Sequence, residues 1–539
     1  MEGSFSLAAT CIPPFLIGAN TSQEKSCGLF VGVERNKFPQ LRRIVCVVAW
    51  PLRATCVHDG SVNGTLNLYM FIQKQHVHFI GIGGIGMSGI AEILLTLGMK
   101  VSGSDLRRGP ITDRLCQMGA TICEGHAAGN LGDASVVVTS SAVSAANPEV
   151  VEARSRKIPV IQRAEMLAEL MRLKYGIAIA GMHGKTTTTS MVASVLAAGG
   201  LDPTVVVGGR VDALGSNARL GSSQYLVAEA DESDRSFLKL PPILAVVTNL
   251  DREHMDCYRD MDDVEAAFLT FMDKVPFYGA VTACLDNPQL AKILPRAQRR
   301  VFTYGVTAAA DYRLEILGDT ELHEERASCA VSGFRRFQVV TANGVLGPFE
   351  LRVPGRHNIL NATAAVAIAC QLDIPAEKIA EGLANFNGVD RRFQLRGRAN
   401  NIAVVDDYGH HPTEISATLA AARECGYNKI HVIFQPHRYT RTRDLIAEFA
   451  KAFTLADDVT VLPIYAASEE PIDGISGELL AARIRDTQAA YAPDFAAAVA
   501  RVAADAEPGD LVMTLGAGNV SQLAPQVLTA IETKAEAAQ

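Results

Sequence analysis

The clearest chemical signal in this sequence is a glycine turn followed directly by Lys and Thr. Residues 177–200, IAIAGMHGKTTTTSMVASVLAAGG, run from an apolar segment through the turn into a stretch with helical character. Backbone N–H groups at such a helix start attract phosphate, Lys185 can reach the terminal phosphates of a nucleotide, and Thr186 can hold Mg²⁺. The usual phosphate loop has four residues between its glycines, whereas this one has two. The sequence therefore predicts a nucleoside triphosphate site built on a shortened loop.

A second glycine turn lies about a hundred residues earlier and has the spacing G-x-G-x-x-G. Gly81, Gly83 and Gly86 follow the apolar segment HVHFI, and Asp105 lies 19 residues after Gly86. That spacing is typical of dinucleotide binding, with the acid placed for a ribose hydroxyl, although such a turn can also serve helix packing alone. By itself it would suggest NAD. Because a hydride-transfer enzyme has no use for a triphosphate loop, we predict that this turn binds a nucleotide diphosphate that is part of a substrate.

Two acidic clusters follow apolar segments in the middle of the chain. EADESD at 229–234 comes after YLVA, and TNLDREHMD at 248–256 comes after ILAVV. Crowded carboxylates repel one another unless a cation faces them. Glu229 and His254 could complete a Mg²⁺ shell with Thr186, although Mg²⁺ prefers oxygen ligands. The alternative for each cluster is a solvated loop.

Arginines and histidines gather in the last third of the chain. They lie in DRRFQ, DDYGHHPTE and FQPHRYTRTRD, and each group adjoins an apolar segment. Arg side chains suit carboxylates and phosphates, so these groups predict a surface that binds anions, with a solvated Arg-rich face as the alternative. Upstream, GRHNILNA at 355–362 offers His and Asn at a helix start, where they could contact a nucleotide or simply cap the helix.

The elements that must position these groups alternate between apolar strands and helical stretches from about residue 76 onward. This alternation predicts an α/β fold with parallel sheets, in which ligands bind beyond the carboxyl ends of the strands. A length of 539 residues suggests about three domains. The predicted segments are an extension at 1–69, a first domain at 70–172, a central domain at 173–388 and a last domain at 389–539.

Composition narrows the functional class. The net charge of -8 argues against nucleic acid as the main partner, and no apolar run is long enough to insert into a membrane. The 11 Cys show no zinc-like pairing and suit a reducing cytoplasm. Residues 1–69 lack a signal-peptide pattern, and MFIQKQHVHFIGIGG from Met70 reads as a natural start. We therefore expect a cytoplasmic enzyme whose activity is unchanged when the chain begins at Met70.

The combined motifs resemble the Mur ligases, a family of ATP-dependent amino-acid ligases. GMHGKTTTT is similar to that family's G-T-H-G-K-T-T loop, with Met182 in place of the usual Thr. HFIGIGGIGMSGIAE, EADESD, GRHNILNA, DDYGHHPTEI and FQPHRYTRTRDL extend the resemblance over about residues 75 to 530. It implies three domains: an N-terminal Rossmann-like domain for a UDP-sugar, a central P-loop ATPase-like domain, and a C-terminal Rossmann-like domain that closes over ATP.

The resemblance also implies the reaction. L-alanine would be joined to the lactyl carboxylate of UDP-N-acetylmuramate through an acyl phosphate, with ATP as co-substrate and Mg²⁺ as the metal, in peptidoglycan precursor synthesis. The chain would be a monomer or homodimer. Another Mur ligase is the nearest alternative, either one that uses a different amino acid or one that recycles a muropeptide. An NAD-dependent dehydrogenase and a non-catalytic nucleotide-binding regulator are more distant alternatives.

Site residues follow from the resemblance motif by motif. Those implied in catalysis are Lys185, His254, Arg391, Arg392 and His410. Those implied in ATP binding are Gly181, Met182, His183, Gly184, Lys185, Thr186, Thr187, Asn249, His357, Asn358 and Asn361. Those implied in UDP-sugar binding are Gly81, Gly83, Gly84, Gly86, Asp105 and Ser140. Positions for the amino acid and acyl phosphate are Tyr408, His410, Arg438 and Arg441, and the metal ligands are Thr186, Glu229 and His254. The choices between Glu229 and Glu232, and between Arg391 and Arg392, stay open at this point.

Overall fold

The computed structural model describes residues 75–140, 142–211, 216–319 and 335–537, with the backbone of two short strands before them. Those strands, β1 (Val45–Ala49) and β2 (Arg53–Val57), pair antiparallel. The rest of the predicted extension lies outside the described residues, so its separation from the working fold stays a prediction. From Gln75 the chain forms one compact unit. Within the described residues, the structure has no helix with the length and apolar character of a membrane span.

The first sheet contains five parallel strands in the order β5-β4-β3-β6-β7. Its strands are β3 (His76–Ile80), β4 (Lys100–Asp105), β5 (Thr121–Glu124), β6 (Val136–Thr139) and β7 (Val160–Gln162). The helices are α1 (Ile85–Thr96), α2 (Pro110–Gln117), α3 (Pro148–Ser155) and α4 (Arg163–Arg172). The central strand β3 is buried along its whole length, and its two imidazoles, His76 and His78, form hydrogen bonds with Oγ of Ser102.

The second sheet has ten strands in the order β10-β9-β11-β8-β12-β13-β14-β15-β16-β17. The seven strands that lie from β9 to β15 in this order run parallel, and β10, β16 and β17 add antiparallel pairs at the two edges. The parallel strands are β8 (Tyr175–Ala180), β9 (Thr204–Val211), β11 (Tyr225–Glu229), β12 (Leu244–Val247), β13 (Ala280–Cys284), β14 (Val301–Gly305) and β15 (Tyr312–Asp319). The antiparallel strands are β10 (Ser216–Arg219), β16 (Arg335–Thr341) and β17 (Gly344–Leu351). The helices are α5 (Lys185–Ala198), α6 (Met261–Met272), α7 (Pro288–Ile293), α8 (Arg356–Gln371) and α9 (Ala376–Ala384). The Ala-rich α8 is almost entirely buried, and its small side chains let α5 pack closely against it.

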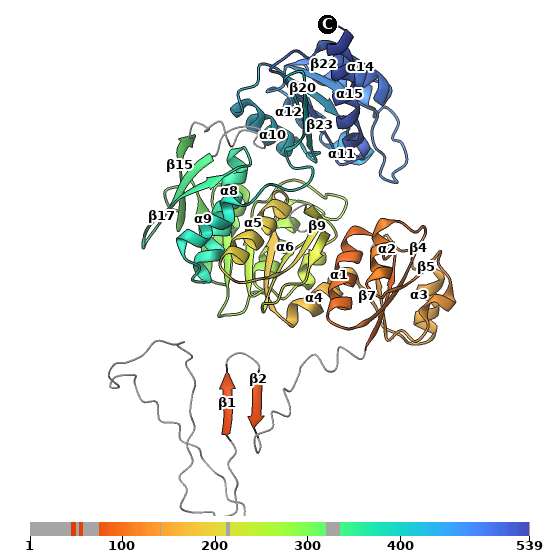
Figure 1. The fold of residues 1–539 in the computed structure, drawn as a ribbon, viewed down its shortest axis with the longest axis vertical. Helices are drawn as coiled ribbons and strands as arrows, with labels where there is room; N and C mark the ends of the chain where they lie inside the picture. The colour runs from red at the N-terminus through yellow and green to blue at the C-terminus, as the bar shows by residue number, and fades with distance from the viewer. Residues whose placement is uncertain are drawn as a thin grey trace, which may run out of the picture. The chain divides into compact units, whose positions relative to one another are not determined.

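The third sheet has six strands in the order β18-β19-β23-β20-β21-β22, with only the β18–β19 pair antiparallel. Its strands are β18 (Gln394–Ala399), β19 (Ile402–Asp407), β20 (Ile430–Phe434), β21 (Asp458–Val461), β22 (Gln488–Tyr491) and β23 (Leu511–Leu515). Its helices are α10 (Pro412–Glu424), α11 (Tyr439–Asp444), α12 (Ile446–Ala452), α13 (Gly477–Arg483), α14 (Phe495–Asp505) and α15 (Leu523–Ala537). In Figure 1, α10 and α12 cover one face of this sheet and α14 and α15 cover the other, which gives two apolar cores.

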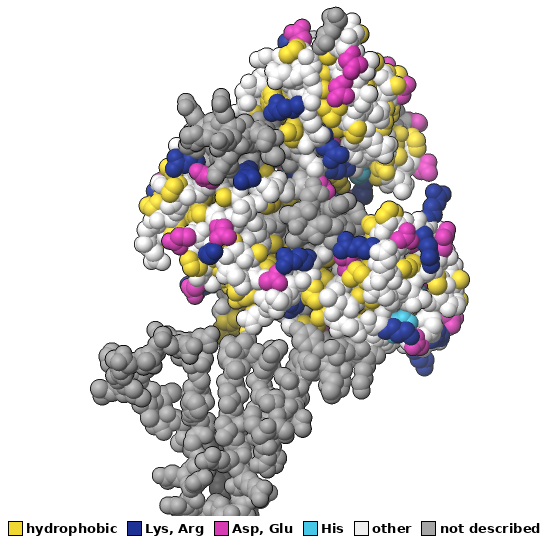
Figure 2. Space-filling model, in the orientation of Figure 1, with side chains coloured by type: hydrophobic (Ala, Val, Ile, Leu, Met, Phe, Trp, Pro, Cys, Tyr) yellow, Lys and Arg dark blue, Asp and Glu magenta, His cyan; other side chains and the backbone are white. Residues whose placement is uncertain are grey.

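The α/β class and the three sheet-bearing units predicted from the sequence are confirmed. The sheets occupy residues 76–162, 175–351 and 394–515, while the exact boundaries between the units stay a prediction. On the face drawn in Figure 2, acidic and basic side chains are interspersed over the described surface. That face carries no broad basic patch among the described residues, which nucleic-acid backbones would require.

Candidate active site

The shortened phosphate loop lies at the carboxyl end of β8, between the neighbouring strands β11 and β12. Gly181 and Gly184 have φ values of 131° and 83°, a region that favours glycine. A Cβ on Gly181 would also lie 2.0 Å from Oγ1 of Thr248. Thr248 approaches so closely that a side chain larger than that of glycine does not fit at position 181. Helix α5 begins directly after Gly184.

The loop is fastened to the end of β12 by hydrogen bonds. The backbone N–H of His183 donates to Oδ1 of Asn249 at 2.9 Å, and Thr248 Oγ1 donates to the His183 carbonyl at 2.6 Å. Asn249 Nδ2 donates to the same carbonyl at 3.0 Å. Asn249, which sequence resemblance assigns to the nucleotide, thus has a second task in shaping the loop.

The Lys185 ammonium is held among oxygen atoms at the base of the loop. Its Nζ lies 2.8 Å from the Gly181 carbonyl and 2.7 Å from Oε1 of Glu232. Burial alone would lower the pKa of Lys185, but the carboxylates of Glu232 and Asp231 raise it further than burial lowers it. Lys185 is therefore a permanent cation at the base of the shortened loop.

A cavity of about 780 Å³ brings together all five residues implied in catalysis. Its lining from the central unit includes Met182, Lys185, Thr186, Glu229, Glu232, Glu253 and His254. Its lining from the last unit includes Arg391, Arg392, Tyr408, His410 and Glu414. Glu232 is fully buried, approaches His254 Nε2 at 3.5 Å, and its Oε2 has no hydrogen-bond partner among the described residues. The cavity thus combines carboxylates, a hydroxyl and cationic side chains around one space.

A smaller cavity of about 200 Å³ lies on the other side of the phosphate loop. The residues implied in ATP binding that line it are His183, Gly184, Thr187, Asn249, His357, Asn358 and Asn361. Asn287, which the sequence reading missed, also lines it and exchanges hydrogen bonds with the Leu250 backbone. Burial and the nearby Arg392 lower the pKa of His357 to about 4, so this imidazole is neutral at physiological pH. The lining therefore offers amide and imidazole groups that could form hydrogen bonds with a nucleoside.

The two neighbouring arginines at 391 and 392 have different surroundings. Arg391 has a φ of 57°, pairs with Asp406 at 3.0 Å and donates to the Gly516 carbonyl at 2.5 Å. Arg392 lines both cavities and reaches Oε1 of Glu414 at 3.3 Å. Both guanidinium groups lie over the Tyr408 ring. Arg391 is therefore anchored within its own unit, whereas Arg392 is the one that faces both spaces.

Two other implied arginines lie outside the cavity linings. Arg438 makes an exposed pair with Asp256 at 3.4 Å, and Arg441 reaches Oε1 of Glu253 at 3.2 Å. Each pair joins the last unit to the loop after β12. Both arginines thus form ion pairs between the two units. His410 and Tyr408, in contrast, line the larger cavity.

Two buried carboxylates that the sequence reading missed organise this contact. Glu253 is 5% exposed and faces Arg441, with His410 Nε2 at 3.7 Å. Burial raises the pKa of Glu253, but the proximity of His410 and His183 brings it well below its usual range. Glu414 lies 3.3 Å from His410 Nδ1, and its pKa is likewise held well below normal by His410, His183 and Arg392 against the effect of burial. In the sequence, the acidic cluster at 248–256 contains Glu253, and a capping-box spacing at the start of α10 contains Glu414. These were the only signals for the two residues.

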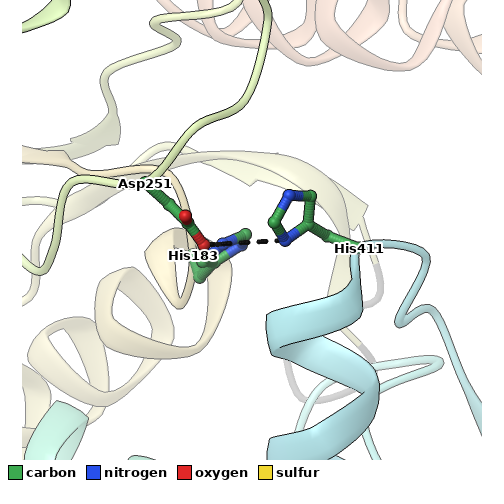
Figure 3. A group of neighbouring side chains, drawn as sticks. All are labelled: His183, Asp251 and His411. Carbon is green, nitrogen blue, oxygen red and sulfur yellow. Dashed lines mark hydrogen bonds and ion pairs between the residues drawn. The ribbon is translucent and has the colours of Figure 1, made fainter. Parts of the chain in front are cut away.

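A third group at the same contact consists of His183, Asp251 and His411 (Figure 3). His183 Nε2 lies 2.9 Å from Oδ2 of Asp251, and His411 Nδ1 lies 3.6 Å from the same oxygen. Two imidazoles and a carboxylate within 4.8 Å of one another could hold a transition metal. Burial alone would lower the pKa of His183, yet its hydrogen bond to Asp251 and the proximity of Glu414 raise it to about 10. His183 and Asp251 form an ion pair within the central unit, and His411 adds a contact from the last unit.

The His183 ion pair gives a prediction for side-chain titration. We expect the imidazole ¹H and ¹⁵N signals of His183 to stay those of the protonated ring up to pH 8.5, since its pKa is about 10. Because the folded-state pKa exceeds the unfolded value of about 6.5, the pair stabilises fully below that value, and this stabilisation is lost as pH rises through about 10. An NMR titration checks this, with His357 as the internal comparison that is neutral over the same range. A neutral His183 ring at pH 7 would contradict the prediction.

The first glycine turn is built around Asp105. The backbone N–H of Gly83 donates to Oδ2 of Asp105 at 2.8 Å, and a Cβ on Gly83 would lie 2.9 Å from that oxygen. Asp105 therefore shapes the turn, and its predicted contact with a ribose stays a prediction. Ser140 lines a pocket with Arg163, whose guanidinium lies against Gly86 and reaches Oδ2 of Asp231 at 3.4 Å. Arg163, which the sequence reading missed, thus connects this turn to the acidic loop of the central unit. Gly81 and Gly84 complete the turn through a hydrogen bond from the Gly84 N–H to the Gly81 carbonyl at 3.1 Å.

Comparisons with protein families match nearly the whole compact unit. Residues 76–175 match the model described as "Mur ligase family, catalytic domain". Residues 179–369 match "Mur ligase middle domain", and residues 391–518 match "Mur ligase, glutamate ligase domain".

Individual relatives agree with these matches. The chain is 65% identical to UDP-N-acetylmuramate--L-alanine ligase of Acidobacterium capsulatum, over 86% of this chain and 99% of that protein. It is 62% identical to the ligase of the same name from Koribacter versatilis, over 87% of this chain and 100% of that protein. Among solved structures, UDP-N-acetylmuramate-alanine ligase of Thermotoga maritima superposes with a TM-score of 0.68 at 29% identity, over 85% of this chain and 99% of that one.

Proposed function

This chain belongs to the Mur ligase family, and on that premise we propose that it joins L-alanine to the lactyl carboxylate of UDP-N-acetylmuramate at the expense of ATP. The reaction is a step of peptidoglycan precursor synthesis. Two relatives above 60% identity that carry the name of this activity support the choice of substrate and amino acid. The structural observation that carries the proposal is the larger cavity, where the phosphate-loop Lys185 faces Arg392 and His410 of another unit.

We assign one substrate to each unit. The first unit, predicted at 70–172, binds the UDP part through the turn from Gly81 to Gly86. The central unit at 173–388 binds ATP, with the nucleoside in the smaller cavity and the terminal phosphate at Lys185. The last unit at 389–539 positions alanine. Family membership supports ATP as the co-substrate, because Mur ligases are ATP-dependent.

The proposed metal is Mg²⁺, which would neutralise the phosphate oxygens of ATP when bound. The donor set fits this ion, because Thr186 and Glu229 supply oxygen and line the larger cavity together with His254. A buried Glu232 carboxylate oxygen without a hydrogen-bond partner among the described residues gives the same place a surplus of negative charge. Glu229 and His254 remain the proposed ligands, and Glu232 is the partner that holds Lys185.

The proposed chemistry proceeds in two steps. The lactyl carboxylate attacks the γ-phosphorus of ATP and ADP leaves, which gives an acyl phosphate. The amino group of alanine then attacks the acyl carbon, the bond from that carbon to the bridging oxygen breaks, and phosphate leaves. Lys185 and Arg392 stabilise the negative charge that two approaching anions bring together. Contact between the central and last units excludes water, which would otherwise consume the acyl phosphate.

Phosphate release from ATP is the direct test. Purified chain, Mg²⁺ and UDP-N-acetylmuramate would be combined in turn with L-alanine, glycine, L-serine, D-glutamate and the tripeptide that a recycling ligase would use. We expect release only when both the UDP-sugar and L-alanine are present, with a product heavier by one alanine residue. Equal release with the tripeptide would replace the proposal by a recycling ligase. Release without the UDP-sugar, or quenching of nicotinamide fluorescence on binding, would reject it.

A further inference from the structure

One carboxylate, that of Asp251, is shared by the phosphate loop and the last unit. Its Oδ2 accepts from His183 Nε2 at 2.9 Å and from Thr413 Oγ1 at 2.7 Å. Thr413 lies in the first turn of α10, whose N-cap residue is His411, and the two partners of Asp251 come from different units. Figure 3 shows the Asp251 carboxylate beside the His183 ring, opposite His411 at the start of α10. A single oxygen atom thus ties the loop that holds phosphate to the helix that approaches it.

These groups do not line the larger cavity. Its lining contains Glu253 and His254 but neither Asp251 nor Thr413. Asp251 and Thr413 line the smaller cavity, proposed above for the nucleoside. At the acyl phosphate, in the larger cavity, Asp251 can therefore act only through the residues it holds. One of them is His183, two positions before Lys185 in the phosphate loop.

The His183 ring is held from both sides. Nε2 faces Asp251 of the central unit, while Nδ1 lies 3.5 Å from Oε1 of Glu414 on α10. Glu414 also reaches Arg392, which lines both cavities. A displacement of α10 away from Asp251 would therefore move Glu414 away from His183 and shift Arg392 with it.

We propose that Asp251 is a positioning residue that keeps α10 against the phosphate loop while the acyl phosphate exists. This inference rests on the proposed ligase activity and adds to it a device for excluding water. Its consequence is chemical. When the contact loosens, water replaces the alanine amino group at the acyl carbon, the bond to the bridging oxygen breaks, and the products are the original carboxylate, phosphate and a proton. ATP is then consumed without ligation.

The measurement is the ratio of phosphate released to alanine ligated, followed in the same reaction with the full chain. The wild-type ratio is expected to be close to one, from the stoichiometry of the reaction. Thr413→Val removes the hydroxyl donor with little change in shape, and Asp251→Ala removes the acceptor. Because a hydrogen bond to a charged group shifts an equilibrium by roughly tenfold, we expect each variant to raise the ratio by about three- to tenfold. The double variant should match Asp251→Ala alone, since Asp251→Ala already removes the contact with Thr413.

Thr440→Val is the matched control. Thr440 Oγ1 donates to Oε1 of Glu469 at 2.6 Å, so the same type of bond is lost, but within the last unit. We expect its ratio to stay at the wild-type value. If Asp251→Ala does not fold, Thr413→Val, at an exposed position, decides the question by itself.

The outcomes separate the two proposals. A slower reaction with an unchanged ratio in Thr413→Val would show a merely structural role and overturn the inference. Equal uncoupling by Thr440→Val would overturn it as well. A wild-type chain without alanine-dependent phosphate release would instead refute the proposed function.

Discussion

Lys185→Ala is expected to lower the rate of alanine-dependent phosphate release by at least about a thousandfold, because the fixed cation at the terminal phosphates is lost. The ammonium lies at the base of the phosphate loop and pairs with the fully buried Glu232 at 2.7 Å. Binding of the UDP-sugar should change less than about threefold, because the first glycine turn lies in another unit. Calorimetric titration with UDP-N-acetylmuramate checks the second statement beside the kinetic assay.

Loss of Lys185 also has a cost in stability. Removing one partner of a buried ion pair destabilises by about 3–5 kcal/mol, since the other charge stays buried. The double variant Lys185→Met with Glu232→Gln removes both charges and should recover most of the melting temperature without recovering activity. Lys378→Ala, which removes an exposed lysine paired with Glu381, is the control and should behave as wild type. Activity in the double variant would contradict the assignment of Lys185 to the phosphate.

Glu253→Gln is expected to reduce the rate by at least about a hundredfold, because it removes the charge that pairs with Arg441 between the units and faces the His410 imidazole at the cavity. Glu253 is 5% exposed, and its pair with Arg441 at 3.2 Å joins two units. The pKa of Glu253 lies well below its usual range through His410 and His183, despite the opposing effect of burial. Its carboxylate is therefore ionised throughout the physiological range, and the variant leaves cationic groups uncompensated.

The same contact contains a natural comparison. Arg438 pairs with Asp256 at 3.4 Å, also across the two units, but the Asp256 side chain is 63% exposed. An exposed pair contributes about 0–1 kcal/mol, so Asp256→Asn should change the rate by less than about threefold. Steady-state kinetics of both variants test the difference. Similar losses in the two variants would mean that any break in the contact matters and that burial of Glu253 has no special role.

Several parts of the fold and the site could be predicted from the sequence, because each is local. The residues of the phosphate loop from Gly181 to Thr186 are consecutive, and their strand-turn-helix setting follows from apolar periodicity and glycine. The same holds for the turn from Gly81 to Gly86. The order of strands and helices predicts parallel sheets, whose carboxyl ends collect the functional groups.

Which polar side chains meet was decided only by the tertiary structure. Asp251 and Thr413 are 162 positions apart, and Glu253 and Arg441 are 188 apart. No periodicity connects such pairs, because their proximity arises from packing one unit against another. The sequence thus indicated a general Mg²⁺ and anion site, while the buried carboxylates that hold the units together were not recognised.

The neighbouring arginines illustrate the same limit. Residues 391 and 392 are adjacent and chemically identical, so the sequence offered no reason to choose between them. The backbone conformation at Arg391, with a φ of 57°, turns its side chain toward Asp406, while Arg392 faces both cavities. The sequence by itself determined the fold class, the two glycine turns and the kinds of chemistry available. Only the tertiary structure decided which charges are buried, paired and placed around one cavity, because burial and pairing depend on contacts between distant segments.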